Sequence, residues 1–341
     1  MPTAIWCAAT VTEGRDEDRV LLGLLADGEF HSGESLAAQL GISRAAIWKR
    51  IAGIEALGLG VERRSGRGYR LCRGIELLDP HRIRDALPEE LRTHVARIDV
   101  HGVVTSTNDV LLQELRSGAA PHAVVCLAER QTSGRGRRGR GWMSPYGSSI
   151  YLSLAWRFER DVGALEGLSL ATGIAAVQAL AQCGVGGVGL KWPNDLFAGG
   201  AKLGGILIEL DGELSGPVTA VIGIGINLRL PREAAATIDQ PWTDLETLAG
   251  HAVGRNELVA ALISSCFTLL PRFALHGLSA VHEDWQRLDL LRGRSVTVTR
   301  GDGRVLRGVA DGVDAGGALR LLCDEGLLLL SGGEVSVRRE A

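Results

Sequence analysis

The chain has 341 residues and a net charge of −3 at neutral pH, with 45 % hydrophobic and 23 % charged residues. This length predicts two or three domains, and the composition excludes a wholly disordered chain. Because the net charge is weakly negative, any nucleic-acid binding has to come from a local basic patch.

The cellular compartment is indicated by the cysteines and by the N-terminus. The cysteines are scattered without a C-x-x-C pair, which predicts unpaired thiols in a reducing cytoplasm rather than a zinc or disulfide scaffold. Residues 1–17 lack the pattern of a signal peptide and are expected to form a disordered extension. The longest apolar run, 168–182, is too short to span a bilayer and predicts a buried helix. The six cysteines are Cys7, Cys72, Cys126, Cys183, Cys266 and Cys323.

The N-terminal region predicts three helices, at 16–26, 34–40 and 44–57, with Ser32 and Ser43 as caps of the second and third. Gly41 marks the short turn between these two helices, an arrangement typical of a helix-turn-helix. Residues 61–71 then predict a basic hairpin, or wing. The expected buried positions are Val20, Leu21, Leu24, Leu25, Ile47, Ile51, Ile54 and Leu57.

Charge favours DNA binding by this region. From Gly41 to Arg73 there are eight Lys or Arg residues against two acids, which gives +6, so the rest of the chain carries −9. Such a local excess predicts contacts with phosphates, although a protein-interaction module with a solvated basic face remains an alternative. Base edges are expected to meet Ser43, Arg44, Ala45 and Trp48, and backbone phosphates to meet Arg64 and Arg67. Lys49 is a further DNA-binding candidate.

Residues 74–87 predict a linker that leads into a short helix, and from Ile98 onward strands alternate with helices. Expected strands lie at 98–104, 123–129, 148–156, 188–192, 202–210 and 219–227, with a helix at 109–115. The pattern predicts a mixed α/β domain around one sheet. From about residue 292, short β runs alternate with Gly/Asp turns and predict a small β-barrel.

Polar clusters interrupt this pattern at three places. Ser106, Thr107 and Asn108 follow a strand, which suits either ligand binding or an ordinary helix cap. The Arg-Gly loop, residues 133–142 (SGRGRRGRGW), could by composition be an RNA-binding tail, but folded segments flank it on both sides. A third segment carries Lys191, Asn194, Asp195 and Lys202 beside apolar strands, where charges are costly unless they bind something. Together the three clusters suit a ligand that carries both polyphosphate and carboxylate.

The ordered set STN (106–108), QTSGRGRRGRGW (131–142), KWPNDLFAGGAKLGGILIEL (191–210) and GIGIN (223–227) resembles the biotin protein ligases. With a basic helix-turn-helix in front, the chain is similar over residues 18–341 to the bifunctional members that also repress the biotin operon. The resemblance implies a multi-domain α+β chain. Its parts would be a winged helix-turn-helix at 18–75, a ligase domain at 76–290 and an SH3-like domain at 291–341.

The resemblance also implies an activity. Biotin and ATP would form biotinyl-5′-AMP with the help of Mg²⁺, and biotin would then pass to a lysine of a biotin carboxyl carrier protein. The adenylate would act as corepressor and promote a homodimer on operator DNA. Because two like charges 4 Å apart repel by roughly 1 kcal/mol in water and about 4 kcal/mol at a dielectric near 20, the first step needs fixed cations.

Site residues follow from the resemblance position by position. Arg137, Lys191 and Lys202 are the catalytic candidates, and Asp195 is the candidate ligand of Mg²⁺. ATP or adenylate would be held by Arg137, Arg140, Lys191, Asn227 and Trp242, although Lys191 as a structural ion pair and Trp242 as core remain alternatives. Biotin would be held by Ser106, Thr107, Asn108, Gln131, Gly134, Arg135, Gly136, Arg137, Lys202 and Gly205.

The Arg-Gly loop is expected to be mobile over 134–142 without ligand, because ordering about ten residues costs on the order of 10 kcal/mol. Thr105, Gly141 and Trp48 depart from the family pattern, and Trp48 puts the operator sequence in doubt. Three other functions stay open: a biotin-sensing transcription factor without catalysis, a ligase that no longer binds DNA, and a lipoate ligase.

Overall fold

The computed structural model describes residues 16–119, 121–212, 216–232, 236–300, 304–331 and 335–339. The chain divides into two compact units, and we describe each by itself. One unit comprises Met1–Leu77 with Pro145–Gly147, and the other comprises Leu78–Ser144 with Ser148–Ala341. Of the expected N-terminal extension, residues 1–15 lie outside the described residues, and α1 already begins at Asp16.

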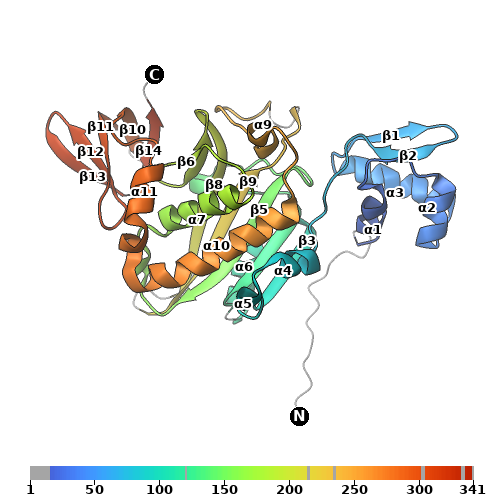
Figure 1. The fold of residues 1–341 in the computed structure, drawn as a ribbon, viewed down its shortest axis with the longest axis horizontal. Helices are drawn as coiled ribbons and strands as arrows, with labels where there is room; N and C mark the ends of the chain where they lie inside the picture. The colour runs from blue at the N-terminus through green and yellow to red at the C-terminus, as the bar shows by residue number, and fades with distance from the viewer. Residues whose placement is uncertain are drawn as a thin grey trace, which may run out of the picture. The chain divides into compact units, whose positions relative to one another are not determined.

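The first unit contains the expected helix-turn-helix and wing (Figure 1). Ser32 Oγ accepts a hydrogen bond from the Ser35 amide at 3.0 Å, and Ser43 Oγ accepts one from the Ala46 amide at 3.2 Å. Gly41 ends the second helix in the left-handed region, at φ 65°. The elements are α1 (Asp16–Leu25), α2 (Gly33–Leu40), α3 (Arg44–Ala56) and the antiparallel pair β1 (Val61–Arg64) and β2 (Gly68–Leu71).

The core of the first unit confirms most of the expected stripe and corrects one position. Val20 is 56 % exposed, so its prediction as a core residue was wrong. Leu22 is buried in its place, because a residue two positions further along the helix lies on the face that α3 covers. Leu24 on α1 and Leu57 at the end of α3 are half-buried. The fully buried side chains are Leu21, Leu22, Leu25, Leu36, Ile47, Ile51 and Ile54.

The second unit is built on a seven-stranded mixed sheet with the order β3-β4-β5-β9-β8-β7-β6. β3 and β4 are parallel and are connected through helix α6 (Thr107–Arg116), while the other neighbours are antiparallel. The strands are β3 (Arg97–Val104), β4 (Val124–Gln131), β5 (Ser149–Phe158), β6 (Val188–Lys191), β7 (Asp195–Ala198), β8 (Ala201–Gly212) and β9 (Val218–Asn227). The mixed α/β expectation is confirmed, and β7 is a strand in addition to the expected ones.

Helices cover both faces of this sheet (Figure 1). α7 (Leu168–Gln182) and α10 (Arg255–His276) cover one face, and α6 covers the other over Val124, Cys126, Ala155 and Val221. By length and composition two segments, Val162–Gln182 and Arg255–Leu288, could cross a membrane, but 61 % of the most apolar window of each is buried in the protein. The shorter helices are α4 (Pro80–Ala86), α5 (Glu89–Arg92), α9 (Leu245–Ala249) and α11 (His282–Leu288).

Glycines replace larger side chains on the α6 face of β8 and β9. The isoleucines of the GIGIN motif, Ile224 and Ile226, point into the core, whereas Gly223 and Gly225 alternate onto the opposite face. A Cβ on Gly223 would lie 2.6 Å from Asn108 Oδ1. The alternation therefore gives the sheet a flat floor beneath the polar residues that follow β3.

A buried ion pair fixes the start of the second unit to its sheet. Arg255 Nη1 lies 2.6 Å from Glu129 Oε2, and the two side chains are 2 % and 0 % exposed. Glu129 Oε1 accepts a hydrogen bond from the Leu78 amide at 2.7 Å, and Arg255 Nη2 donates to the Ser149 carbonyl at 3.2 Å. The charges thus connect the first residue of the unit to β4, β5 and α10.

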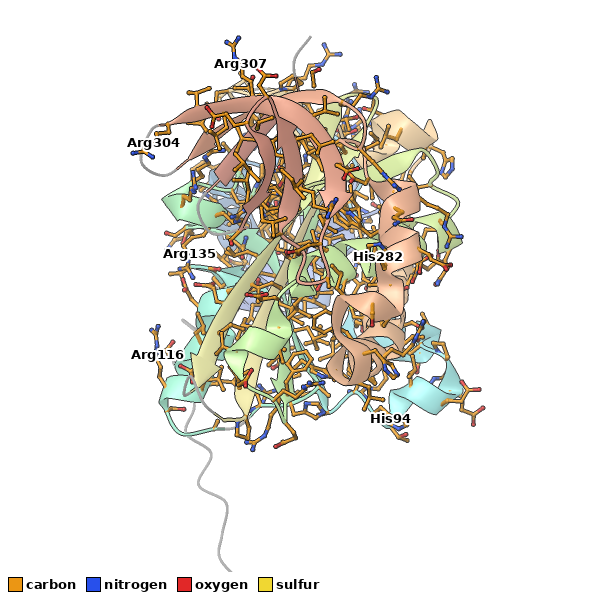
Figure 2. All side chains as sticks on the ribbon, turned by 90° about the vertical axis from the view of Figure 1, so that its left-hand side faces the viewer. His94, Arg116, Arg135, His282, Arg304 and Arg307 are labelled. Carbon is orange, nitrogen blue, oxygen red and sulfur yellow. The ribbon has the colours of Figure 1, made fainter. Side chains whose placement is uncertain are left out.

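The C-terminal strands form a separate five-stranded antiparallel sheet with the order β13-β12-β11-β10-β14. Figure 2 looks onto this sheet, with Arg307 at its upper rim and Arg304 at its left-hand edge. The Trp192 indole is buried and its Nε1 donates to the Gly317 carbonyl at 2.9 Å, which joins this sheet to the domain of the seven-stranded sheet. The strands are β10 (Ser295–Arg300), β11 (Val305–Val313), β12 (Leu319–Cys323), β13 (Gly326–Leu330) and β14 (Val335–Arg339).

Candidate active site

The Ser106-Thr107-Asn108 cluster lies at the start of α6, and all three side chains are buried. Ser106 occupies the N-cap position, but its side chain makes no capping hydrogen bond. The Thr107 amide instead donates to Gln131 Oε1 at 2.9 Å, and Thr107 Oγ1 lies 3.2 Å from the same oxygen. An ordinary helix cap therefore does not account for the Ser106 hydroxyl.

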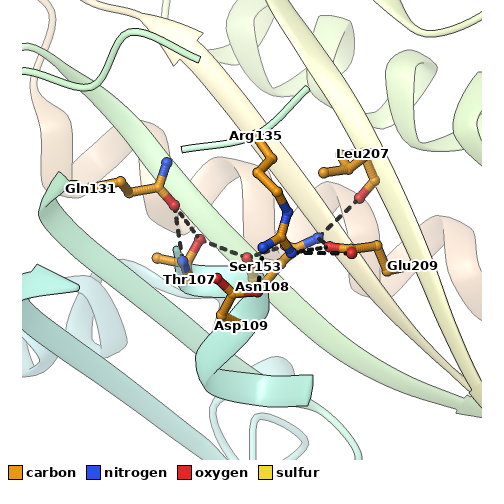
Figure 3. A network of polar contacts seen from close by, with 8 residues as sticks. All are labelled: Thr107, Asn108, Asp109, Gln131, Arg135, Ser153, Leu207 and Glu209. Atoms are coloured by element: carbon orange, nitrogen blue, oxygen red, sulfur yellow. Dashed lines mark hydrogen bonds and ion pairs between the residues drawn. The ribbon is translucent and has the colours of Figure 1, made fainter. Parts of the chain in front are cut away.

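The Asn108 side chain is hydrogen-bonded to two strands, β5 and β8, which lie on either side of β9. Its Oδ1 accepts from Ser153 Oγ at 2.5 Å, and its Nδ2 donates to Glu209 Oε2 at 2.7 Å (Figure 3). Ser153 Oγ also lies 2.7 Å from Thr107 Oγ1. The amide of Asn108 is thereby fixed in one orientation against Gly223.

Arg135, the first arginine of the Arg-Gly loop, is paired with two carboxylates. Its Nη1 lies 2.5 Å from Asp109 Oδ1, and its Nη2 lies 3.1 Å from both oxygens of Glu209 (Figure 3). Burial opposes the charged form, but the hydrogen bonds to Asp109 and Glu209 outweigh it and raise the pKa of Arg135. We call Asp109, Arg135 and Glu209 the Arg135 clamp.

The Arg-Gly loop folds back on itself as a hairpin. The Trp142 amide donates to the Gly134 carbonyl at 2.8 Å, and the Gly136 amide donates to the Arg140 carbonyl at 2.7 Å. At the tip, Arg138 is in the left-handed region at φ 60°. The loop thus has a paired base, residues 134–136 and 140–142, and a tip, residues 137–139.

Arg137 has a different electrostatic environment from Arg135. The only side-chain hydrogen bond of Arg137 among the described residues joins Nη1 to the neutral Asn194 Oδ1 at 3.2 Å. Burial lowers the pKa of Arg137, and the positive charges of Arg138 and Arg140 lower it further, although Asp195 opposes them. An anion bound beside Arg137 would relieve this repulsion.

Lys202 and Asp195 form a half-buried ion pair, with Lys202 Nζ 2.7 Å from Asp195 Oδ1. The ammonium also lies 5.6 Å from the centroid of the Trp142 ring. Trp142 Nε1 is shielded from solvent and has no hydrogen-bond partner within the described ranges, so it is a donor available to a bound ligand. Trp242 pairs with Lys202 through the backbone, since the flanking Pro241 and Thr243 bond to it.

The remaining candidates lie around this centre. Lys191 lies opposite Asp195 in the β6–β7 register, and its Nζ is 4.7 Å from the centroid of the Phe197 ring. Arg140 is exposed at the base of the loop. Asn227 Nδ2 donates to the Thr243 carbonyl at 3.0 Å, which connects the end of β9 to the Trp242 segment. Gly205 lies on the floor, and a Cβ added to it would lie 3.4 Å from Asp195 Oδ1.

Sequence reasoning missed several residues of the site. Asp109, Ser153 and Glu209 contact the predicted residues but carry no motif of their own, and Trp142 was quoted in the loop without a role. The even-odd alternation of GGILIEL, which places Glu209 on the same face as Gly205, was the one available signal.

The first unit presents its predicted DNA-binding residues at the surface. Trp48 is 60 % exposed on α3, and Arg44, Ala45 and Lys49 are exposed beside it. On the wing, the guanidinium carbons of Arg64 and Arg67 lie 5.2 and 4.3 Å from the centroid of the Phe30 ring, so Phe30 orients both cations.

Three protein families match the chain in succession. Residues 18–70 match the HTH domain, residues 100–227 the Biotin/lipoate A/B protein ligase family, and residues 292–338 the Biotin protein ligase C terminal domain. These domains define a ligase of the biotin/lipoate type with an attached helix-turn-helix domain.

Two curated relatives match nearly the whole chain. The "Bifunctional ligase/repressor BirA" of Salmonella typhimurium is 43 % identical over 93 % of this chain and 96 % of its own, and that of Escherichia coli is 41 % identical over the same shares. The chain therefore belongs to the family of bifunctional biotin ligase/repressors. Among solved structures, "Biotin protein ligase from Aquifex aeolicus in complex with biotin and ATP" superposes with a TM-score of 0.61 at 26 % identity, over 72 % of this chain and all of that one.

Proposed function

We propose that this protein makes biotinyl-5′-AMP from biotin and ATP and transfers the biotinyl group to a lysine of a biotin carboxyl carrier protein. A carboxylate oxygen of biotin attacks the α-phosphorus, and the bond to the leaving pyrophosphate breaks. The lysine amine then attacks the carbonyl carbon of the mixed anhydride, AMP leaves, and the amine loses a proton. Family membership and the site geometry both support this reaction.

The observation that carries the proposal is the contrast between two arginines of one loop. Arg135 is neutralised by Asp109 and Glu209, whereas Arg137 has a lowered pKa and only a neutral hydrogen-bond partner. Arg137 is therefore the guanidinium of this pair that suits the biotin carboxylate and the phosphoryl oxygens. Lys202 supplies a second cation, and Ser106, Thr107 and Gln131 supply polar groups for the biotin ring system.

Asp195 is the proposed ligand of Mg²⁺, and it is the one side chain that we propose for the metal. Its Oδ1 already contacts Lys202 Nζ, so a metal ion would share this carboxylate with the ammonium. Within the described part of the chain, no group of three or more His, Cys, Asp or Glu residues could hold a metal. Most Mg²⁺ ligands would therefore come from ATP phosphates and water, as is usual for this ion.

The test is one incubation of the full chain with biotin, ATP, Mg²⁺ and a biotin-acceptor fragment. We expect pyrophosphate and AMP to be released and one acceptor lysine to be biotinylated, as read by mass spectrometry. A chain that binds biotin but transfers none would instead be a sensor without catalysis. A parallel reaction with lipoate, which we expect to give no product, separates the biotin ligase from a lipoate ligase.

A second proposed function is repression of biotin synthesis from operator DNA. The +6 charge of residues 41–73, the exposed start of α3 and the wing support it. The adenylate would promote a homodimer that spans two half-sites, because paired helix-turn-helix domains read half-sites one helical turn apart. The five described cysteines are free, which favours a reducing compartment, so we place the protein in the cytoplasm.

Gel shifts on DNA upstream of biotin-synthesis genes, with and without the adenylate, test repression separately from catalysis. We expect a shift that the adenylate strengthens, together with an adenylate-dependent dimer in sedimentation. Ligase activity without any shift would leave a ligase whose front domain has lost operator binding.

A further inference from the structure

The base of the Arg-Gly loop is anchored by ion pairs between side chains of the protein itself. Asp109 comes from α6 and Glu209 from β8, so the Arg135 clamp joins the loop to two elements that flank the site (Figure 3). The three side chains are each about one-third exposed, so solvent screens the pairs only in part.

The clamp also has a geometric connection to the biotin site. Both carboxylate oxygens of Glu209 accept from Arg135 Nη2 at 3.1 Å, and Oε2 also accepts from Asn108 Nδ2 at 2.7 Å. The same carboxylate therefore sets the position of the loop and the orientation of the amide beside Gly223. Removal of its charge would disturb both at once.

We propose that Asp109 and Glu209 are positioning residues that hold the base of the Arg-Gly loop in place before any ligand binds, so that biotin and ATP need to order only the tip. This inference rests on the proposed ligase reaction for its kinetic consequence, but not for its structural one. The proposal divides the loop into two parts. In the base, the Trp142 and Gly136 amides are hydrogen-bonded and protected from exchange, and the tip around Arg138 remains mobile. Fewer residues then lose backbone freedom when the ligand binds.

Hydrogen exchange on the ligand-free full-length protein tests the structural part. In Asp109→Asn, Glu209→Gln and the double variant, we expect the Gly136 and Trp142 amides to exchange about threefold to tenfold faster than in the unmodified protein, as the loss of partly screened ion pairs implies. Glu114→Gln is the matched control, because it breaks a similar carboxylate–arginine pair, with Arg97, on the same helix. Equal exchange of both amides in Asp109→Asn and in the unmodified protein would overturn the proposal.

The kinetic part separates positioning from a general loss of structure. We expect the KM for biotin to rise about threefold to tenfold in Asp109→Asn, while kcat at saturating biotin stays within about twofold, because the catalytic cations are untouched. In an Arg135→Gln background, Asp109→Asn should have no further effect on exchange or KM. A fall in kcat with an unchanged KM would contradict the assignment.

The two proposals fail in distinguishable ways. If the unmodified protein transfers no biotin, the ligase reaction is wrong, while the exchange experiment still decides whether the clamp exists. If Glu209→Gln does not fold, Asp109→Asn carries the test alone, since Asp109 lies at the partly exposed surface of α6. Normal ligase activity with unchanged exchange in that variant rejects the clamp and leaves the reaction intact.

Discussion

Trp142 lies across Gly225, with its ring atom Cε2 2.9 Å from the position that a Cβ on Gly225 would occupy. The end of the Arg-Gly loop therefore rests on a strand position that has no side chain. The same ring lies 5.6 Å from Lys202 Nζ, so this contact sets where the loop meets Lys202. Gly225 is thus a steric requirement of the site and not of the sheet.

Replacement of Gly225 by alanine should displace Trp142 and weaken biotin binding. Because a misplacement of about 1 Å costs up to about a hundredfold in rate, we expect the KM for biotin to rise by about tenfold or more. The matched control is Gly102→Ala on β3, where an added Cβ meets no atom within 4 Å. Equal KM values for the two variants would show that the ring is not positioned by the floor.

Arg137→Gln should impair adenylate formation far more than folding. Loss of one preorganised charge from a transition state typically costs about a hundredfold to a thousandfold in kcat. The rate of pyrophosphate release measures this step, and thermal unfolding should stay close to that of the unmodified protein because Arg137 has only a neutral partner. A change in carrier biotinylation without a change in pyrophosphate release would move Arg137 to the second step.

Arg255→Ala should strongly destabilise the second unit, since it leaves the buried Glu129 carboxylate without its counter-charge. The expected loss in unfolding free energy is about 3–5 kcal/mol, measured by urea denaturation. Arg157→Ala breaks an exposed pair with Glu159 and should cost less than about 1 kcal/mol. Similar losses of unfolding free energy in both variants would indicate that burial of the Glu129–Arg255 pair does not determine its contribution to stability.

Stability should fall when the pH drops below 6.5, in part through His122. Burial lowers the pKa of His122 from its ordinary value of 6.5, the Arg157 charge adds to the effect, and Nδ1 accepts a hydrogen bond from the Arg157 amide at 3.1 Å. The unfolded chain then takes up the proton first, so the contribution is complete above 6.5 and is lost as the pH falls through the folded-state pKa. His122→Gln should flatten this part of the pH profile of urea unfolding, and an unchanged slope would assign it elsewhere.

Phe30→Leu should weaken DNA binding without changing its sequence preference. The ring lies beneath the guanidinium groups of Arg64, Arg67 and Arg70, and each exposed cation–π contact contributes about 0.5–1 kcal/mol. We expect affinity for any duplex to fall about threefold to fivefold with the salt slope retained, whereas Arg67→Ala should reduce that slope by about one. A loss confined to one operator sequence would argue that Phe30 acts through α3 instead.

Much of the fold followed from local patterns, and the exceptions have physical reasons. Capping serines, alternating strands and the small-residue helix α7 predicted the elements because each depends on neighbours within a few residues. Strand β7 was missed because Pro193, Asn194 and Asp195 favour a turn, and only pairing with β6 and β8 extends the chain there. Val20 was misplaced because two faces of a short helix were both apolar.

The residues of the site likewise fall into those that the sequence predicted and those that only the fold brings together. Motif residues such as Arg137 and Lys202 were found by resemblance, and their place in the site remains to be tested by mutation. Glu209 was not found, because its partners Arg135 and Asn108 are 74 and 101 residues away and only the sheet register brings them together. Ser153 likewise reads as an ordinary strand residue until Asn108 is placed above it.

The hydrogen bond from Trp192 to Gly317 changes how the C-terminal sheet should be regarded. Trp192 follows Lys191 directly. The backbone that carries this lysine is therefore held in place by a hydrogen bond to a carbonyl of a different domain. If the chain were cut before β10, the apolar indole of Trp192 would be exposed and its N–H would lose its hydrogen-bond acceptor. The described C-terminal strands therefore complete the packing of the ligase domain, and we expect a shortened gene to produce a defective enzyme rather than a minimal one.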